Sequence, residues 1–266
     1  MQKKYIFATG LSIIKSKRQV VQFKNNDMEK AKDGEFFGKR VKLAELATIT
    51  TFATYQLLLI KQPELKQSYK LFISKNISID TITCIVAKEG KAPFVLLADE
   101  MTLRYISFFL NSTWGKLFLI PEDKYEKQAG ITNTVLIKNT LIVFHKDMKP
   151  FCIILEELMD YLHTYLAKKY KDEDRYSATI SRFFSQVRDA MVMELFMPSI
   201  FKSYQISVLA PWRKEVEKLV AGVKEREAIT RIFDSLVSPG NELMENMNRM
   251  RLFMKEFTNF LIKNRQ

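Results

Sequence analysis

The hydrophobic pattern of the sequence changes at Pro150, and this change limits the possible folds more than any other feature. Before Pro150, apolar residues gather in short β-branched or aromatic runs separated by polar turns, which is typical of strands. After it, they recur every three or four positions, which is typical of helices that bury one face. The pattern therefore predicts an α+β chain, with a mixed α/β domain over residues 1–150 and a helical bundle over residues 151–266.

In the first domain we expect several strands and one helix. Asp99 and Glu100 suit the positive N-terminal end of a helix, so the helix is expected over residues 99–110. Residues 131–144 form two Thr-, Ile- and Val-rich runs around Lys138-Asn139, and both runs are predicted to be strands. The other predicted strands are 41–51, 70–73, 81–86 and 94–97.

Helical periodicity runs through most of the second domain. The predicted helices are 151–165, 180–191 with an end near Pro198, 216–236 with a stutter, and a final helix that follows Pro239-Gly240. In the final helix, apolar residues step alternately by four and three, as at the a and d positions of a coiled coil. An ordinary core helix shows the same pattern, so both interpretations stay open. The stepped residues are Leu243, Met247, Met250, Met254, Phe257 and Leu261.

The charge of the chain is unevenly distributed. The 42 basic and 30 acidic side chains give a net charge of +12. Residues 1–150 hold 24 basic and 14 acidic side chains, a balance of +10, whereas residues 151–266 hold 18 and 16, a balance of +2. A concentrated positive field favours a polyanion, and nucleic acid is the commonest one in a cytosol. A lysine-rich surface that keeps the protein in solution is the alternative.

Familiar signatures of catalysis and cofactor binding are missing from the sequence. It has no Gly-x-Gly-x-x-Gly or Gly-Lys-Ser/Thr phosphate loop and no Gly-x-Ser-x-Gly elbow, so we expect no cofactor. Cys84 and Cys152 lie in apolar runs and are expected to be buried thiols. Together with His145 and His163 they match no zinc-site spacing, so no metal centre is expected, and both histidines are interpreted as structural.

One short pattern keeps an enzymatic alternative open. Asp80 precedes an apolar run, and Glu89-Gly90-Lys91 follows that run. Many metal-dependent nucleases have this layout, in which two carboxylates bind Mg²⁺ and a lysine steadies the attacking water or the scissile phosphate. A strand that ends in a charged turn produces the same pattern, so the residues alone do not decide between the two.

No membrane or secretion signal is visible in the sequence. The longest apolar runs, such as 57–60 and 117–120, are far too short to span a bilayer. The first ten residues contain early lysines but no long apolar core or small-residue cleavage site. We therefore expect a cytoplasmic protein.

Three segments stand out by their order and spacing. The first is Val-Lys-Leu-Ala-Glu-Leu-Ala-Thr-Ile-Thr-Thr at 41–51, the second contains Leu-Asn-Ser-Thr-Trp-Gly at 110–115, and the third begins Gly-Ile-Thr at residue 130. In this order they resemble the target recognition domain of type I restriction–modification specificity subunits. In that family a closing strand and a Pro-led spacer helix follow, and here Lys149-Pro150 leads into the first helix of the second domain.

The resemblance covers about residues 38–170 and includes clear departures from the family pattern. The opening segment continues into Phe52 where the family has glycine, and a central basic glycine loop is reduced to residues 87–92. The spacer helix lacks the family's usual Pro-Pro-x-x-x-Gln entry. A full specificity subunit carries two such domains and this chain has room for one, so it resembles a half-length relative.

The resemblance implies a non-catalytic, sequence-specific reader of double-stranded DNA. In such a domain Lys and Arg hold phosphates while polar side chains on loops reach base edges. The candidate phosphate contacts are Lys15, Lys17, Arg18, Lys24, Lys88, Lys91, Arg104 and Lys116. The candidate base contacts are Thr50, Thr51 and Asn133.

For the helical domain, the resemblance implies contacts with proteins. We expect it to dock a DNA methyltransferase subunit, and the final helix to pair with residues 151–165 within one chain or across a homodimer. Four methionines between Met244 and Met254 would make that surface adaptable. A plain intramolecular bundle, or a helical scaffold whose α/β part binds protein, are the alternatives.

Overall fold

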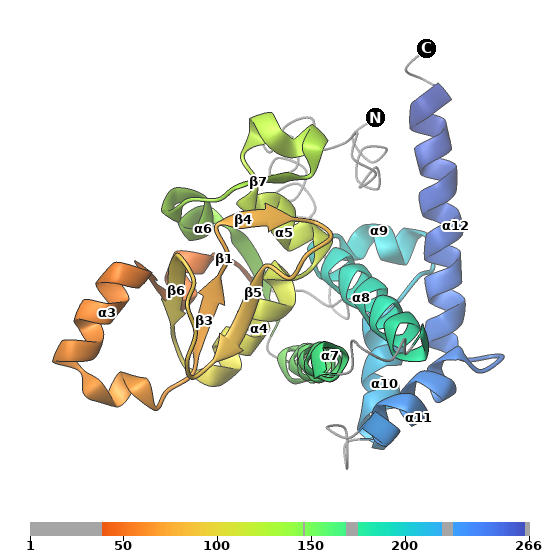
Figure 1. Cartoon of the computed structure of the whole chain (residues 1–266). Coiled ribbons are helices and arrows are strands. Elements are labelled where there is room, and N and C mark those ends of the chain that lie inside the picture. Colours follow the sequence, from red (N-terminus) through yellow and green to blue (C-terminus); the bar gives the residue numbers. More distant parts are fainter. Residues whose placement is uncertain (1–38, 146, 169–174, 220–225, 264–266) are drawn as a thin grey trace. The chain divides into compact units, whose positions relative to one another are not determined.

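The computed structural model describes residues 39–145, 147–168, 175–219 and 226–263. The chain divides into two compact units, and the division falls between Phe144 and His145. We call residues 39–144 the sheet unit and the described residues from 145 onward the helical unit (Figure 1). The protein combines α-helices with antiparallel β-sheets, as expected for an α+β chain.

A four-stranded antiparallel sheet forms the centre of the sheet unit. Its strand order is β2-β6-β3-β5, and its two faces differ because side chains alternate along each strand. Helix α4 packs against β3 and β5. Phe72 and Val95 form a buried cluster with Tyr55 of α3. The bounds are β2 (Thr48–Thr51), β3 (Lys70–Ile73), β5 (Cys84–Ala87), β6 (Phe94–Leu97), α3 (Phe52–Lys61) and α4 (Glu100–Leu110).

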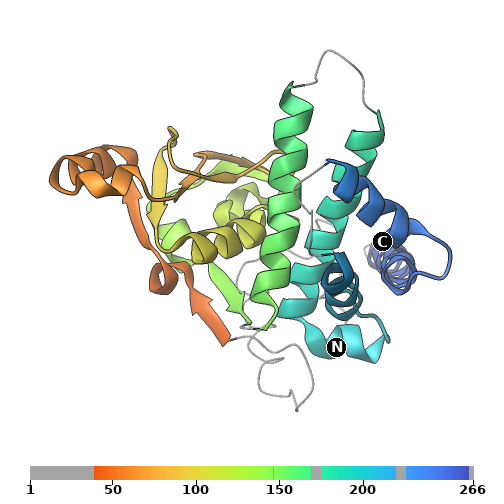
Figure 2. The ribbon, with the colours of Figure 1, turned by 90° about the horizontal axis from the view of Figure 1, so that it is seen from below.

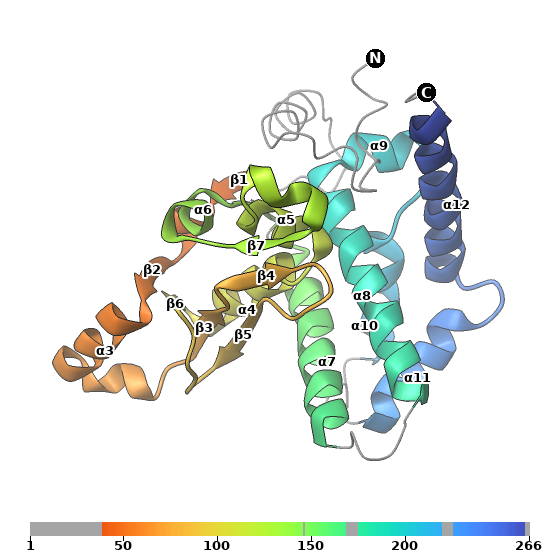
Figure 3. The ribbon, with the colours of Figure 1, turned by 45° about the horizontal axis from the view of Figure 1, so that its top comes forward.

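Two smaller sheets complete this unit. Strand β1 (Lys39–Lys42) pairs with β8 (Leu141–Phe144), and β4 (Asn76–Ser78) pairs with β7 (Ala129–Ile131), the latter pair visible in Figure 3. The buried hydroxyl of Tyr105 donates to the carbonyl of Val143 at 2.7 Å, which ties α4 to β8. The remaining elements are α2 (Leu43–Leu46), α5 (Thr113–Leu119), α6 (Thr134–Asn139) and short 3-10 helices at Pro63–Lys66 and Glu122–Lys127.

Most of the predicted elements of the sheet unit are confirmed. Strands 70–73 and 94–97 form with the predicted bounds, and the predicted strand 81–86 forms as β5. The predicted helix 99–110 is α4, with Asp99 as its N-cap: one carboxylate oxygen accepts from the backbone N–H of Thr102 at 2.9 Å.

Two of the strand predictions were wrong in part, because a local cap outweighed β propensity. The run at 131–139 contains helix α6, and the side-chain oxygen of Asn133 caps it by accepting from the N–H of Leu136 at 2.9 Å. The run at 41–51 is interrupted by helix α2, where Glu45 reaches back to the N–H of Lys42 at 3.0 Å. These caps place both short helices beside β2.

The helical unit contains six helices within its described residues, and α7 and α8 lie side by side (Figure 2). The predicted helices 151–165, 180–191 and 243–261 are confirmed. The described parts of the predicted helix 216–236 belong to α10 and α11. The bounds are α7 (Lys149–Lys168), α8 (Arg175–Phe196), α9 (Pro198–Ser203), α10 (Leu209–Leu219), α11 (Arg226–Val237) and α12 (Glu242–Lys263).

Polar side chains are built into the core of this unit. Trp212 is fully buried, and its indole N–H donates to the carbonyl of Phe151 at 3.0 Å. Arg188 of α8 forms an ion pair with Glu156 of α7 at 3.3 Å, and both side chains are almost completely buried. Removal of one partner of such a pair leaves a buried charge without compensation, so these contacts fix how α7, α8 and α10 pack.

The first three stepped residues of α12 belong to the core of the helical unit. Leu243, Met247 and Met250 are buried, and α12 packs against α10 and α11. The first half of the stepped pattern therefore packs within the chain. The side chains of Met254, Phe257 and Leu261 lie outside those that the structure describes. Among the described helices, none combines the length and apolar character needed to cross a bilayer.

Candidate nucleic-acid interface

Two of the predicted phosphate contacts meet on one aromatic ring. The ammonium of Lys88 lies 5.4 Å from the centre of the Tyr69 ring, and the guanidinium of Arg104 lies 5.5 Å from it. Lys88 follows β5, Arg104 lies on α4 and Tyr69 precedes β3, so three separate segments build this group. We call Tyr69, Lys88 and Arg104 the Tyr69 cluster. An aromatic face stabilises cations close to it and fixes where their charge is presented.

The acidic neighbours of this cluster moderate its charge. Glu100 pairs with Arg104 one helical turn away, at 2.9 Å, and the Arg104 side chain is 15% exposed. Lys88 is exposed, and so are Glu89 and Lys91 in the same turn. A phosphate that approached Arg104 would therefore compete with the Glu100 carboxylate, and the cluster would become more positive as that pair opened.

A fully buried lysine holds the backbone under the cluster in place. The ammonium of Lys70 donates to the carbonyls of Lys66, Ser68 and Lys88, at 3.2, 2.8 and 2.7 Å. Its burial lowers the pKa of Lys70, while the charge of Glu89 acts in the opposite direction. Because three carbonyls from two segments share one cation, the turn that carries Lys88 is fixed next to the segment that carries Tyr69.

Several other candidate residues do not fit a contact with DNA. Lys116 is buried and its ammonium donates to the carbonyl of Ile79 at 2.9 Å, so it joins α5 to the segment after β4. Thr50 is buried in β2. Because both side chains are buried in this structure, the proposed DNA contact does not include Lys116 or Thr50.

Thr51 and Asn133 are exposed, but both side chains already cap helices. The hydroxyl of Thr51 accepts from the N–H of Thr54 at 3.3 Å at the start of α3. Asn133 caps α6 as described above. A role in base recognition would have to disturb these caps, so neither residue is carried into the proposal below. The candidates Lys15, Lys17, Arg18 and Lys24 lie outside the described residues.

The residues of the nuclease alternative lie far apart in the fold. Asp80 comes before β5 and Glu89 and Lys91 come after it, so the length of the strand separates the two carboxylates. A four-residue strand spans about 10 Å, whereas a metal ion needs its ligands within about 2.5 Å of one centre. In the described parts of the chain, no three His, Cys, Asp or Glu side chains come together as a metal site would require.

The Leu-Asn-Ser-x-x-Gly segment has a structural role that the sequence did not reveal. Buried Asn111 accepts from the N–H of Cys84 at 3.2 Å and donates to the carbonyl of the same residue at 3.0 Å. Ser112 caps α5 by accepting from the N–H of Gly115 at 3.0 Å. A Cβ atom on Gly115 would lie 1.8 Å from the carbonyl oxygen of Phe109. This segment therefore builds the corner between α4 and α5 and fixes it to β5.

The sheet unit carries a moderate positive surplus. Residues 39–144 hold 14 basic and nine acidic side chains, a balance of +5, and two of the basic side chains, Lys70 and Lys116, are buried. Sequence patterns gave no indication of Tyr69, because its two cationic partners come from distant segments. Comparisons with protein-family models, curated proteins and solved structures find no match to this chain.

Proposed function

We propose that this protein is a non-catalytic DNA-binding subunit that reads duplex sequence for a restriction–modification system. The Tyr69 cluster carries the proposal, because it unites Lys88 and Arg104, two phosphate contacts predicted from separate segments. In this proposal Lys88, Lys91 and Arg104 hold phosphates and fix the register of the sheet unit on the duplex.

The order of the elements also supports this proposal. The family that the sequence resembles has a closing strand and then a Pro-led helix, and here β8 is followed by α7, which begins at Lys149-Pro150. We propose that the helical unit docks a DNA methyltransferase subunit. A homodimer through α12 would have to use its C-terminal half, since Leu243, Met247 and Met250 are buried within the chain.

Replacement of both cluster cations tests the proposed contact. We expect the double variant Lys88→Gln, Arg104→Gln to bind duplex DNA at least about tenfold more weakly at low salt, because two charge-assisted phosphate contacts are lost. Fluorescence anisotropy with a labelled random-sequence duplex measures this loss. The control is Lys75→Gln, because Lys75 is exposed beyond the other end of β3 and its loss should change the affinity less than about twofold. Equal affinities of the double variant and the wild type would contradict a role for the cluster.

A further inference from the structure

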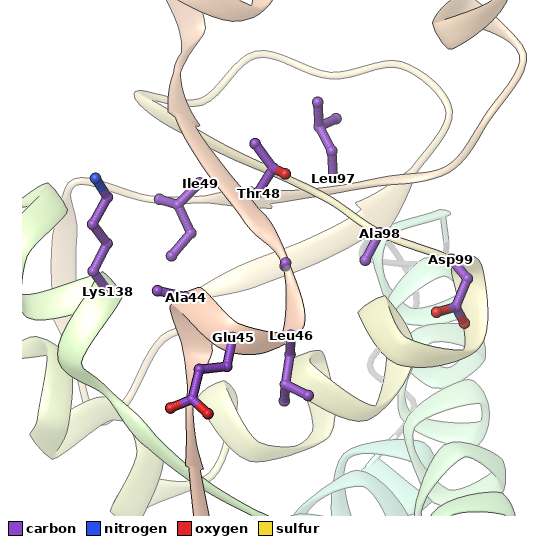
Figure 4. A pocket seen from close by; sticks show the side chains of 10 residues that line it. Ala44, Glu45, Leu46, Thr48, Ile49, Leu97, Ala98, Asp99 and Lys138 are labelled. Carbon is purple, nitrogen blue, oxygen red and sulfur yellow. The ribbon is translucent and has the colours of Figure 1, made fainter.

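An open groove of about 650 Å³ lies beside β2 in the sheet unit (Figure 4). Its walls come from α2 and β2, from the end of β6 and from α6. Leu46, Ile49 and Leu97 give the groove an apolar lining, and Glu45, Asp99 and Lys138 supply charge. Exposed polar side chains, including Thr48, share the lining with these apolar residues, so the groove is open and of mixed polarity.

The backbone of β2 presents hydrogen-bonding groups along this edge of the sheet. The N–H of Phe52 donates to the carbonyl of Pro93 at 3.0 Å, which makes these two residues a hydrogen-bonded pair. Because such pairs alternate along an antiparallel ladder, the backbone groups of Thr48 and Thr50 face β6, and those of Ile49 face away from it. In the described sheet β2 pairs with β6 alone, so β2 is an edge strand and the N–H and C=O of Ile49 lie on its outer side.

The opposite edge of the same sheet, on β5, differs in its backbone hydrogen bonding. On β5 the outward N–H and C=O of Cys84 are both bonded by the side-chain amide of Asn111, at 3.2 and 3.0 Å. The amide thereby replaces a neighbouring strand, which prevents another chain from pairing there. On β2 the corresponding position of Ile49 borders the groove, and within the described residues no strand pairs with this edge.

The charges of the groove indicate which segment fits. Glu45 and Asp99 are exposed carboxylates on the Leu46 side of the groove, and Lys138 lies on the Ile49 side (Figure 4). One oxygen of each carboxylate accepts a backbone N–H at a helix start, from Lys42 at 3.0 Å and from Thr102 at 2.9 Å, and these caps hold both charges in place at the groove. The groove therefore has more negative than positive groups, although the sheet unit as a whole is positive. A phosphate backbone would be repelled by these carboxylates, whereas a lysine or arginine side chain would be attracted.

We propose that the outer edge of β2 binds an extended, basic peptide of a partner protein as an additional strand. The backbone of the peptide pairs with the N–H and C=O of Ile49, its alternate apolar side chains enter the groove, and a cationic side chain meets Glu45 and Asp99. This interaction is independent of the proposed DNA contact, because it uses neither Lys88 nor Arg104.

Binding of a defined peptide to the full chain tests the proposal. The probe is a fluorescein-labelled peptide Lys-Val-Thr-Val-Thr-Lys, and a peptide with Glu in place of both Lys is its charge-reversed partner. We expect saturable binding of the lysine peptide by fluorescence anisotropy, at least about tenfold tighter than that of the glutamate peptide.

Two variants separate the backbone contact from the charge. Ile49→Pro removes the outward N–H, which β6 does not use, together with part of the apolar side chain, and proline is tolerated at such an edge position. We expect it to keep the wild-type circular dichroism spectrum and to bind the lysine peptide at least about tenfold more weakly, whereas Ile49→Val should bind as the wild type does. Glu45→Gln keeps an acceptor for the N–H of Lys42 and should weaken binding about threefold.

Three results would overturn the proposal. They are no binding of the lysine peptide, equal binding of the two peptides, and unchanged binding by both Ile49→Pro and Glu45→Gln. Light scattering tests whether a second copy of the chain, instead of a peptide, pairs with this edge. A concentration-dependent dimer that Ile49→Pro dissociates would assign the edge to a second copy of the chain and would also overturn the proposal.

Discussion

Replacement of Gly115 by alanine is expected to lower the free energy of unfolding of the sheet unit by at least about 3 kcal/mol. The added methyl group would lie 1.8 Å from the carbonyl oxygen of Phe109 and 2.6 Å from its carbonyl carbon. Both atoms belong to the backbone of α4, so no side chain can rotate away to relieve the contact. The corner between α4 and α5 would have to open, and the Ser112 cap and the Asn111 contacts with β5 would be strained.

Hydrogen exchange followed by mass spectrometry in increasing urea measures this effect separately for each unit. Peptides from 84–110 report on the sheet unit, and peptides from 180–196 report on the helical unit and should be unaffected. Gly90→Ala is the matched control, because the nearest neighbours of its added methyl group are ring atoms of the Phe72 side chain, at 2.9 Å and more, and not backbone atoms. We expect Gly90→Ala to cost about 1 kcal/mol. A Gly115→Ala protein as stable as the Gly90→Ala protein would contradict the close packing of this corner.

Replacement of Glu194 by alanine is expected to destabilise the helical unit by about 3 kcal/mol. One carboxylate oxygen of Glu194 accepts from the N–H groups of Val208 and Leu209, at 2.7 and 2.8 Å, and the other accepts from the hydroxyl of Ser207 at 3.0 Å. Alanine would leave two buried N–H groups at the start of α10 without acceptors. Glu194→Gln is the matched control, since its carbonyl oxygen can accept from both N–H groups.

The same residue predicts a pH dependence with a definite sign. Burial raises the pKa of Glu194 from 4.5 to about 7, against the effect of its three hydrogen-bond donors. Because the folded form holds this proton more tightly than the unfolded form, the stabilising contribution is complete below pH 4.5 and is lost as the pH rises to about 7. The loss is about 3 kcal/mol in the wild type and should be absent in Glu194→Gln. Urea unfolding measures the free energy of unfolding of the wild type and of Glu194→Gln at pH 5 and at pH 8. The change between the two pH values in the wild type, minus the change in the variant, gives this contribution. An equal pH dependence in both proteins would contradict it.

The parts of the fold that could be predicted from sequence are those that local pattern determines. Strand β6 lies between two other strands and its side chains are mostly buried. Its uninterrupted Phe-Val-Leu-Leu run is typical of such a strand, so its position was predicted correctly. Helix α4 was marked by its Asp99 cap and its apolar spacing. Helix α6 was missed because its Val and Ile residues favour strands, and a single cap at Asn133 reversed that preference.

The candidate site could be predicted only in part, because tertiary contacts decide which lysines reach solvent. Lys88 and Arg104 were found as basic residues that flank family-like segments. Lys116 is also a basic residue in such a segment, yet it is buried and its ammonium donates to the carbonyl of Ile79. Lysine is rarely buried without partners, and the carbonyls that satisfy Lys70 and Lys116 come from other segments of the fold. No local pattern could have distinguished these cases or placed Tyr69 between two cations.

The salt dependence of DNA binding tests the central claim most directly. The association constant of the full chain for a random-sequence duplex is measured between about 50 and 200 mM salt, for the wild type and for Lys88→Gln, Arg104→Gln. If the cluster holds phosphates, log K falls steeply with log salt, and the double variant has a slope shallower by about 2 because each lost phosphate contact removes about 0.9. A wild-type affinity that is absent or insensitive to salt, or identical slopes for the two proteins, would contradict the assignment of this surface to DNA.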